Sequence, residues 1–211
     1  MRFYKKIKKR LRREKFKITT ICLIRHGETD WNALGKLQGR TDIPLNPTGI
    51  RQAEECRDFL KENHWDIIVT SPLQRAKRTA EIINEGLQIP LVEMEEFVER
   101  SFGDAEGMTR EEIESKYPNR NIPNQEERSA LNERVLAGIE KINRKYVNKK
   151  VLLVAHGGVI NAILSILSDG EIGSGKTRLI NACISNINFQ EEKWLISDFN
   201  QVGHLSKYKE L

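Results

Sequence analysis

Three consecutive residues near the start of the chain, Arg25, His26 and Gly27, carry groups suited to phosphoryl chemistry. The arginine guanidinium is a planar fork that matches the oxygens of a phosphate group. A neutral imidazole can attack phosphorus as a nucleophile, and a glycine allows the backbone to approach a ligand closely. A bare tripeptide of this kind is more often an ordinary strand end, so the elements around it have to decide its role.

Polar residues follow directly after each of three predicted buried strands, at 19–25, 66–70 and 151–155. These residues are His26 after the first strand, Ser71 and Arg75 after the second, and His156, Gly157 and Gly158 after the third. Ligands of parallel α/β sheets bind beyond the carboxyl ends of the strands, so we expect the three groups to meet there as an anion pocket. Helix N-termini after Ser71 and Gly157 would direct amide groups at the same anion.

The chain as a whole alternates predicted strands with predicted helices. We expect helices at 47–63, 73–87, 109–117, 126–147 and 159–167, a short strand at 91–94, and an antiparallel strand pair at 179–189 and 193–197. Asn46 or Thr48 is the expected N-cap of the first helix, with Pro47 in its first turn. This alternation predicts an α/β fold with a mostly parallel central sheet and helices on both faces.

The longer sequence around His26 resembles the signature of the histidine phosphatase superfamily, the phosphoglycerate-mutase-like proteins. The residues that carry the signature are Arg25, His26, Gly27, Glu28, Thr29, Trp31 and Asn32. The resemblance continues through LQGRTDIPLNPTGIRQAE (37–54), SPLQRAKRTAEII (71–83) and VAHGGVI (154–160). It covers nearly all of residues 18–205 and implies one phosphoglycerate-mutase-like domain over 18–211.

Membership of this family implies a phosphomonoesterase that forms a phosphohistidine on His26. Arg25, Arg75 and His156 would neutralise the oxygens of the transferring phosphoryl group, which is the main catalytic contribution in such reactions. We expect the nearby guanidinium groups to keep His26 neutral, and its second ring nitrogen to donate to a backbone carbonyl. The further substrate contacts expected are Asn32, Gln38, Gly39, Arg100 and Gly157.

The general acid is identified by the resemblance alone. Members of the family place a glutamate a few residues before a Phe-Gly or Leu-Gly step, and Glu99 stands in that relation to Phe102-Gly103 in the segment EFVERSFGDAEGMT. Glu99 would protonate the leaving oxygen and then activate the water that hydrolyses the phosphohistidine. The neighbouring acidic residues that compete for this role are Glu95, Glu96, Asp104 and Glu106.

Two other functions have to be weighed against the phosphatase. A cofactor-dependent phosphoglycerate mutase would use the same site, but its relatives carry longer insertions than the 24 positions between Arg75 and Glu99 allow. Arg100 and Arg110 could nevertheless hold a substrate carboxylate. A non-catalytic module that binds phosphorylated ligands is disfavoured, because the whole set of expected catalytic residues is intact.

A second motif, GEIGSGKT at 170–177, matches the nucleotide-binding P-loop pattern. A P-loop needs a strand before it and a helix after it, whereas here a predicted helix precedes the motif and a predicted strand follows it. We therefore expect a mobile glycine-rich loop at this place and no nucleotide site.

The positive charge of the chain is concentrated at its N-terminus. Residues 1–17 contain ten Lys or Arg and one Glu, a net +9, while residues 18–211 contain 25 basic and 29 acidic residues, a net −4. We interpret 1–17 as a solvated basic arm, with a helix that contacts an anionic surface as the alternative. For the rest of the chain we expect a small phosphorylated metabolite as substrate and no nucleic acid partner.

The remaining composition indicates a chain that uses neither metal nor cofactor. Cys22, Cys56 and Cys183 lie far apart, without metal-ligand spacing or a disulfide framework, and a reducing cytoplasm is their simplest setting. We find no apolar run of the roughly 20 residues that would span a membrane and no signal peptide.

Overall fold

Six strands form one mixed sheet in the order β3-β2-β4-β1-β5-β6 in the computed structural model, which describes residues 18–208. The strands are β1 Thr19–Arg25, β2 Ile67–Thr70, β3 Leu91–Glu93, β4 Lys150–Ala155, β5 Ile184–Gln190 and β6 Lys193–Gln201. The first four in sheet order are parallel, β5 pairs antiparallel with β1, and β6 pairs antiparallel with β5. The predicted mostly parallel sheet is confirmed. The predicted arm at 1–17 lies outside the described residues.

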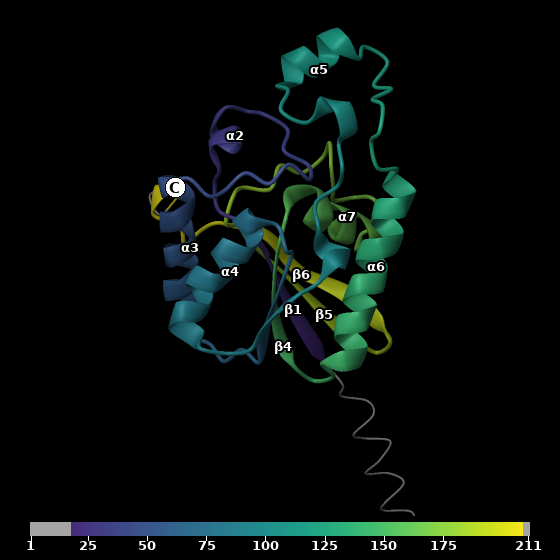
Figure 1. Cartoon of the computed structure of the whole chain (residues 1–211). Helices are drawn as coiled ribbons and strands as arrows, with labels where there is room; N and C mark the ends of the chain where they lie inside the picture. The colour runs from purple at the N-terminus through teal and green to yellow at the C-terminus, as the bar shows by residue number, and fades with distance from the viewer. Residues whose placement is uncertain (1–17, 209–211) are drawn as a thin grey trace, which may run out of the picture.

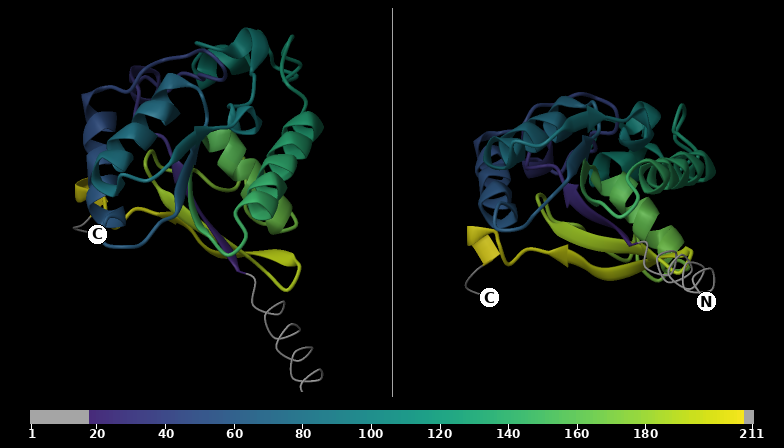
Figure 2. Two further views of the ribbon diagram at one scale, coloured as in Figure 1. Left: turned by 60° about the horizontal axis from the view of Figure 1, so that its bottom comes forward. Right: turned by 90° about the horizontal axis from the view of Figure 1, so that it is seen from below.

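Helices cover both faces of this sheet, as expected (Figures 1 and 2). One face carries α3 (Pro47–Leu60) and α4 (Gln74–Leu87), and the other carries α6 (Arg128–Lys145) and α7 (Gly157–Leu167). Each central strand therefore buries both sets of its alternating side chains. Ile21 and Leu23 of β1 pack with α6 and α7, and its residues Cys22 and Ile24 pack with α3 and α4.

The residues at the start of α3 explain why this helix begins where it does. Asn46 is the N-cap of α3, where its side-chain oxygen accepts a hydrogen bond of 2.8 Å from the amide of Gly49. Pro47 occupies the first turn, where its missing N–H costs nothing. Of the two expected caps, Asn46 is therefore the correct one. Among residues 18–208, no helix is long and apolar enough to cross a membrane.

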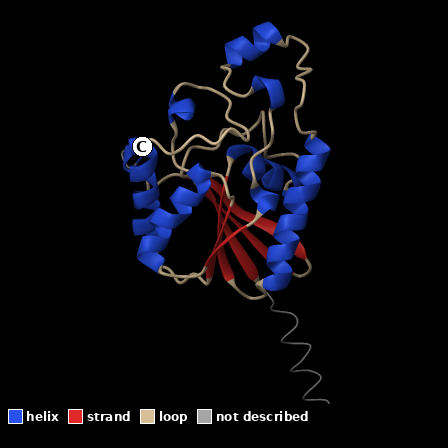
Figure 3. Cartoon of the chain, in the orientation of Figure 1, coloured by secondary structure: helices blue, strands red, loops and turns tan. Residues whose placement is uncertain are grey.

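The connections that leave the carboxyl ends of the parallel strands lie at one end of the sheet, the upper end in Figure 3. They include the short helices α2 (Asp30–Ala33) and α5 (Arg110–Lys116) and single 3₁₀ turns at Glu95–Phe97 and Gly103–Ala105. A further 3₁₀ turn, Ser206–Tyr208, ends the described chain. The glycine-rich segment 170–177 has the predicted context, since α7 precedes it and β5 follows it.

Two strand boundaries were wrong by four residues or more: β6 continues to Gln201, beyond the expected end at 197, and β5 starts late. The strand expected at 179–189 begins only at Ile184, because the chain first turns around the end of β1. Ala182 has the left-handed φ of 60°, and its amide donates to the carbonyl of Arg25 at 3.1 Å. The guanidinium of Arg25 donates in turn to the carbonyl of Leu179 at 2.6 Å. These bonds fold residues 179–183 over the strand end that carries His26.

Candidate functional site

His26 lies directly after β1 with its ring buried and its tautomer defined. Its Nδ1 is 2.7 Å from the carbonyl oxygen of Gly27, and a carbonyl oxygen can only accept, so Nδ1 carries the proton. In a neutral ring Nε2 then keeps its lone pair. The predicted bond from the second ring nitrogen to a backbone carbonyl is confirmed. Gly27 permits close packing against the first turn of α3, since an added Cβ would lie 2.3 Å from the carbonyl oxygen of Gly49.

Arg75, in the first turn of α4, is a fully buried cation fixed by three hydrogen bonds. Its Nη2 and Nη1 donate to the carbonyls of Gly39 (2.7 Å) and Thr41 (2.9 Å), and its Nε donates to Nδ1 of His156 (3.2 Å). The residues after β2 therefore meet the loop after β1 and the end of β4 through a single guanidinium.

His156, the N-cap residue of α7, is completely buried. Because Nδ1 accepts from Arg75, Nε2 carries the proton and donates to Oγ of Ser71 at 2.8 Å. Its ring centre is 5.2 Å from that of His26. Both ring nitrogens are thus bonded to protein groups, and His156 lies behind Arg75 and beside His26.

The carboxylate of Glu99 lies at the N-terminus of α7, where we had expected backbone amides to bind the anionic ligand. Its carboxylate accepts from the amides of Gly158 (2.9 Å) and Val159 (3.2 Å) in the first turn of α7. At the start of α4, the amide of Gln74 donates to Asp42 at 2.8 Å. The prediction that these helix N-termini point free amides at the ligand was therefore wrong for these three groups, because carboxylates of the protein already cap them.

A cavity of about 440 Å³ opens at this end of the sheet. Eight of the ten predicted site residues line it, namely Arg25, His26, Asn32, Gln38, Gly39, Arg75, Glu99 and Gly157. His156 lies behind this lining, and Arg100 lines a neighbouring cavity instead. The backbone between Glu99 and Arg100 therefore directs consecutive side chains into different cavities.

Unpaired polar atoms mark this cavity as a ligand site. Among the residues that the structure describes, three buried side-chain polar atoms have no hydrogen-bond partner, and all three belong to residues that line it. They are Nε of Arg25, Oε1 of Gln38 and Oδ1 of Asn161. Because an unpaired buried polar atom costs roughly 1–3 kcal/mol, such atoms are expected where a ligand supplies the missing partner.

The glycine-rich loop and the turn after it were missed as parts of the site. Ser174, Gly175, Thr177 and Arg178 line the cavity with Asn181. The Nδ2 of Asn181 donates to the carbonyl of His26 at 3.1 Å and to Oδ1 of Asn32 at 3.0 Å. Asn161, from α7, was also missed. The resemblance to a P-loop drew attention to this loop, but nothing local in the sequence placed it beside His26.

The electrostatics favour neutral histidines next to permanent cations. Burial, followed by the charges of Arg75 and Arg25, lowers the pKa of His26 well below its usual value. Burial, followed by Arg75 and His26, lowers the pKa of His156 in the same direction. A neutral nucleophile beside two guanidinium groups is suited to phosphoryl transfer. Within residues 18–208, no group of three or more His, Cys, Asp or Glu could hold a metal ion.

The fold and this site define a protein of the phosphoglycerate-mutase-like class. Residues 21–202 match the family model of the histidine phosphatase superfamily (branch 1), and the chain belongs to that family. The chain is 56% identical over 191 residues to a protein of Bacillus subtilis (strain 168) named "Uncharacterized phosphatase PhoE", covering 90% of this chain and 99% of that protein.

Two further comparisons show the range of names within the family. The chain is 32% identical over 202 residues to a "Probable phosphoglycerate mutase GpmB" of Klebsiella pneumoniae (strain 342), covering 88% of this chain and 94% of that protein. It also resembles a solved structure of Entamoeba histolytica phosphoserine phosphatase in complex with 3-phosphoglyceric acid. That match has a TM-score of 0.79 and 33% identity, and covers 89% of this chain and 99% of the other.

The buried neutral histidines should make stability depend on pH. In the unfolded chain a histidine has a pKa near 6.5, whereas His26 and His156 have lowered pKa values in the folded protein. As the pH falls below about 6.5, the unfolded state therefore gains protons that the folded state does not. The free energy of unfolding should fall by up to about 1.4 kcal/mol per pH unit for each histidine.

Urea unfolding between pH 6.5 and 5.0 tests this expectation. His156→Asn should flatten the decline of unfolding free energy with falling pH relative to wild type. The comparison variant His64→Asn replaces a side chain that is 80% exposed, and it should flatten the decline less than His156→Asn does. Three parallel curves would show that His156 gains protons equally in the folded and unfolded states.

Proposed function

We propose that the protein is a phosphomonoesterase that hydrolyses small phosphorylated metabolites through a phosphohistidine on His26. The observation that carries this proposal is the His26 tautomer, with Nδ1–H bonded to the Gly27 carbonyl and the lone pair of Nε2 available in a cavity lined by Arg25 and Arg75. The phosphatase name of the Bacillus subtilis relative supports the same activity.

In the first step, the phosphoryl group of the substrate lies between Arg25 and Arg75. Nε2 of His26 attacks phosphorus, and the bond from phosphorus to the ester oxygen breaks as the P–N bond forms. Glu99, in its protonated form, donates the proton that the leaving oxygen needs. His156 accepts a hydrogen bond from Nε of Arg75 and so fixes the guanidinium that faces the transferring oxygens.

In the second step, the carboxylate of Glu99 takes a proton from water as the water attacks the phosphohistidine. The P–N bond breaks, inorganic phosphate leaves, and Nε2 of His26 recovers its lone pair. The positive charge in both steps comes from Arg25 and Arg75, so we propose a reaction that needs no added metal ion. Asn32, Gln38, Gly39, Gly157 and the missed residue Asn161 would contact the substrate.

The nucleophile can be tested directly. His26→Ala should reduce hydrolysis of 4-nitrophenyl phosphate by at least about 1,000-fold, because the proposed covalent intermediate forms on this side chain. Rapid denaturation of the wild type during turnover, followed by mass spectrometry, should find phosphate on the peptide that contains His26. His64→Ala is the matched control and should keep full activity. A phosphorylated Ser71, or an active His26→Ala variant, would refute the proposal.

The general acid can be tested by varying the leaving group. Glu99→Gln keeps an oxygen that can accept from the amides of α7 but cannot transfer a proton. Hydrolysis of an alkyl ester such as glycerol 3-phosphate should fall by about 100- to 10,000-fold. The first step with 4-nitrophenyl phosphate, which needs no proton, should lose about tenfold or less. Glu95→Gln alters an exposed neighbour and should behave as wild type with both esters. An equal loss with the two esters would remove Glu99 from this role.

A phosphoglycerate mutase is the second candidate, favoured by the name of the Klebsiella pneumoniae relative. A mutase has to keep its phosphohistidine away from water while the intermediate turns over, which calls for a closing cap. The segments that could close over His26, 86–96 and 103–125, are short and polar, and we expect water to reach the phosphoenzyme.

The two functions separate in one assay. The enzyme is given 3-phosphoglycerate with a catalytic amount of 2,3-bisphosphoglycerate, and 2-phosphoglycerate and inorganic phosphate are followed together. Phosphate release should exceed isomerisation by at least about tenfold, because hydrolysis of an accessible phosphohistidine competes with transfer back to substrate. Isomerisation that outruns phosphate release by orders of magnitude would assign the mutase activity instead.

A further inference from the structure

A second cavity, of about 530 Å³, lies next to the one that contains His26. Loop residues 35–37 line both cavities, and the segment 108–128 supplies most of the rest of the second lining. Two consecutive residues line different cavities: Glu99 lines the one that contains His26, and Arg100 lines the second. The role proposed for His26 makes no use of this second space.

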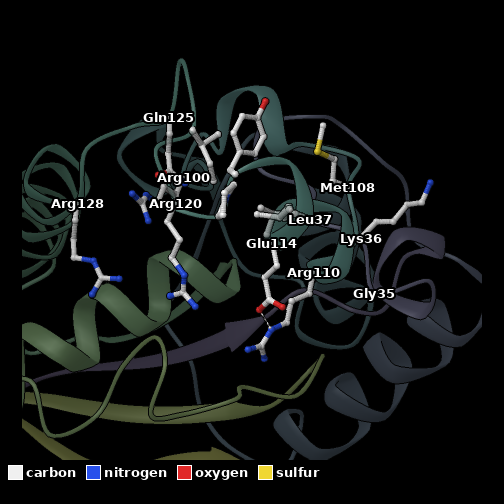
Figure 4. Close-up of a pocket in the computed structure, with 14 residues that line it drawn as sticks. Gly35, Lys36, Leu37, Arg100, Met108, Arg110, Glu114, Arg120, Gln125 and Arg128 are labelled. Atoms are coloured by element: carbon white, nitrogen blue, oxygen red, sulfur yellow. Dashed lines mark hydrogen bonds and ion pairs between the residues drawn. The ribbon is translucent and has the colours of Figure 1, made fainter.

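Four arginines line this second cavity, which we call the arginine cavity: Arg100, Arg110, Arg120 and Arg128. In Figure 4 the side chains of Arg110, Arg120 and Arg128 extend to the same side of the backbone, while Lys36 points away from them. One carboxylate lines the cavity, that of Glu114, and it is bound to Nε of Arg110 at 2.7 Å. The other three arginines are left without a partner of opposite charge in the lining.

Among the residues that the structure describes, the contacts of these three arginines leave Arg120 and Arg128 without a carboxylate partner, while Arg100 is attracted by Glu126, Glu127 and Glu99 without an ion pair to any of them. Arg100 donates through Nε to the carbonyl of Glu126 at 2.9 Å, which holds the side chain but leaves both terminal nitrogens available. Within residues 18–208, the side chains of Arg120 and Arg128 form neither an ion pair nor a hydrogen bond. Burial, followed by the nearby charge of Arg128, lowers the pKa of Arg100, and this outweighs the attraction of the carboxylates.

The positive charge of the arginine cavity contrasts with the negative net charge of the domain. Residues 18–211 have a net charge of −4, yet the arginine cavity collects four guanidinium groups against one carboxylate. Like charges so placed repel, and a bound polyanion would remove the repulsion while forming charge-assisted, bidentate hydrogen bonds. Half-buried apolar side chains, among them Ile113, Tyr117 and Ile122, form the rest of the lining and could contact the body of an organic ligand.

We propose that the arginine cavity binds a phosphate-type polyanion, with Arg100, Arg120 and Arg128 as its ligands. Two sources can supply such a group. One is a second phosphate on a substrate whose first phosphate lies at His26, since the two cavities share residues 35–37. The other is a separate polyanion that binds beside the catalytic cavity. The first source depends on the proposed phosphatase activity, and the second does not.

The first arm of the test measures binding without turnover. Inorganic tripolyphosphate is titrated by calorimetry into protein saturated with vanadate, which as a phosphate analogue occupies the His26 cavity. The double variant Arg120→Gln/Arg128→Gln should weaken tripolyphosphate binding at least tenfold. The matched control Arg51→Gln/Arg144→Gln removes the same charge from exposed positions outside both cavities and should bind as wild type.

The second arm measures kinetics with fructose 1-phosphate and fructose 1,6-bisphosphate, which differ by one distal phosphate. If the substrate supplies the polyanion, the Arg120→Gln/Arg128→Gln variant should raise KM at least tenfold for the bisphosphate alone, with kcat unchanged. Turnover of 4-nitrophenyl phosphate reports on the proposed function separately, because that ester has no second anion. If no ester is hydrolysed, the phosphatase proposal fails and the calorimetry still decides the present one. A loss within threefold of the control pair in both arms would overturn the arginine cavity as a polyanion site.

Discussion

The architecture of the site depends on holding guanidinium groups away from carboxylates at the carboxyl ends of parallel strands. Within residues 18–208, neither Arg25 nor Arg75 forms an ion pair, although Arg75 is completely buried. A buried charge is costly unless hydrogen bonds and an opposite charge compensate it. Here backbone carbonyls satisfy part of each guanidinium, and Nε of Arg25 has no partner. Glu99 lines the same cavity and attracts both guanidinium groups without pairing with either, so an anionic ligand would add the negative charge that they lack.

The rest of the fold supplies the rigidity that this arrangement needs. Arg134 of α6 donates to the backbone carbonyls of Glu96, Val98 and Glu99, and its guanidinium is paired with Glu126 at 2.7 and 2.9 Å. The segment that carries Glu99 is thus attached to one helix through its backbone and to the start of α7 through its carboxylate. Gly158 makes the second attachment possible, since an added Cβ would lie 2.5 Å from Oε1 of Glu99.

The parts of the site that follow buried strands could be predicted from the sequence, because strand ends are visible as apolar runs and parallel strands finish together. His26, Arg75 and His156 were found in this way. Glu99 could not be distinguished from four neighbouring carboxylates without the family resemblance, since only its tertiary contacts set it apart.

The contribution of Asn181 could not be predicted from the sequence for a different reason. It depends on the left-handed turn at Ala182 and on the pairing of β5 with β1, which are non-local features. The separation of Arg100 from the catalytic cavity depends on the direction in which its side chain leaves the backbone, which spacing alone does not give.

The sheet order also has a consequence for how the chain is made. Strand β1 pairs only with β4 and β5 among the described strands, and both are encoded in the last third of the sequence. Arg25 and Lys150 are 125 positions apart, so at typical synthesis rates β1 waits on the order of 6–25 s for its first partner. During that time an apolar segment destined for the middle of the sheet has no hydrogen-bonding partner on the ribosome. The nascent chain is therefore exposed to aggregation over most of its translation, and protection by chaperones would be most useful to it during that interval.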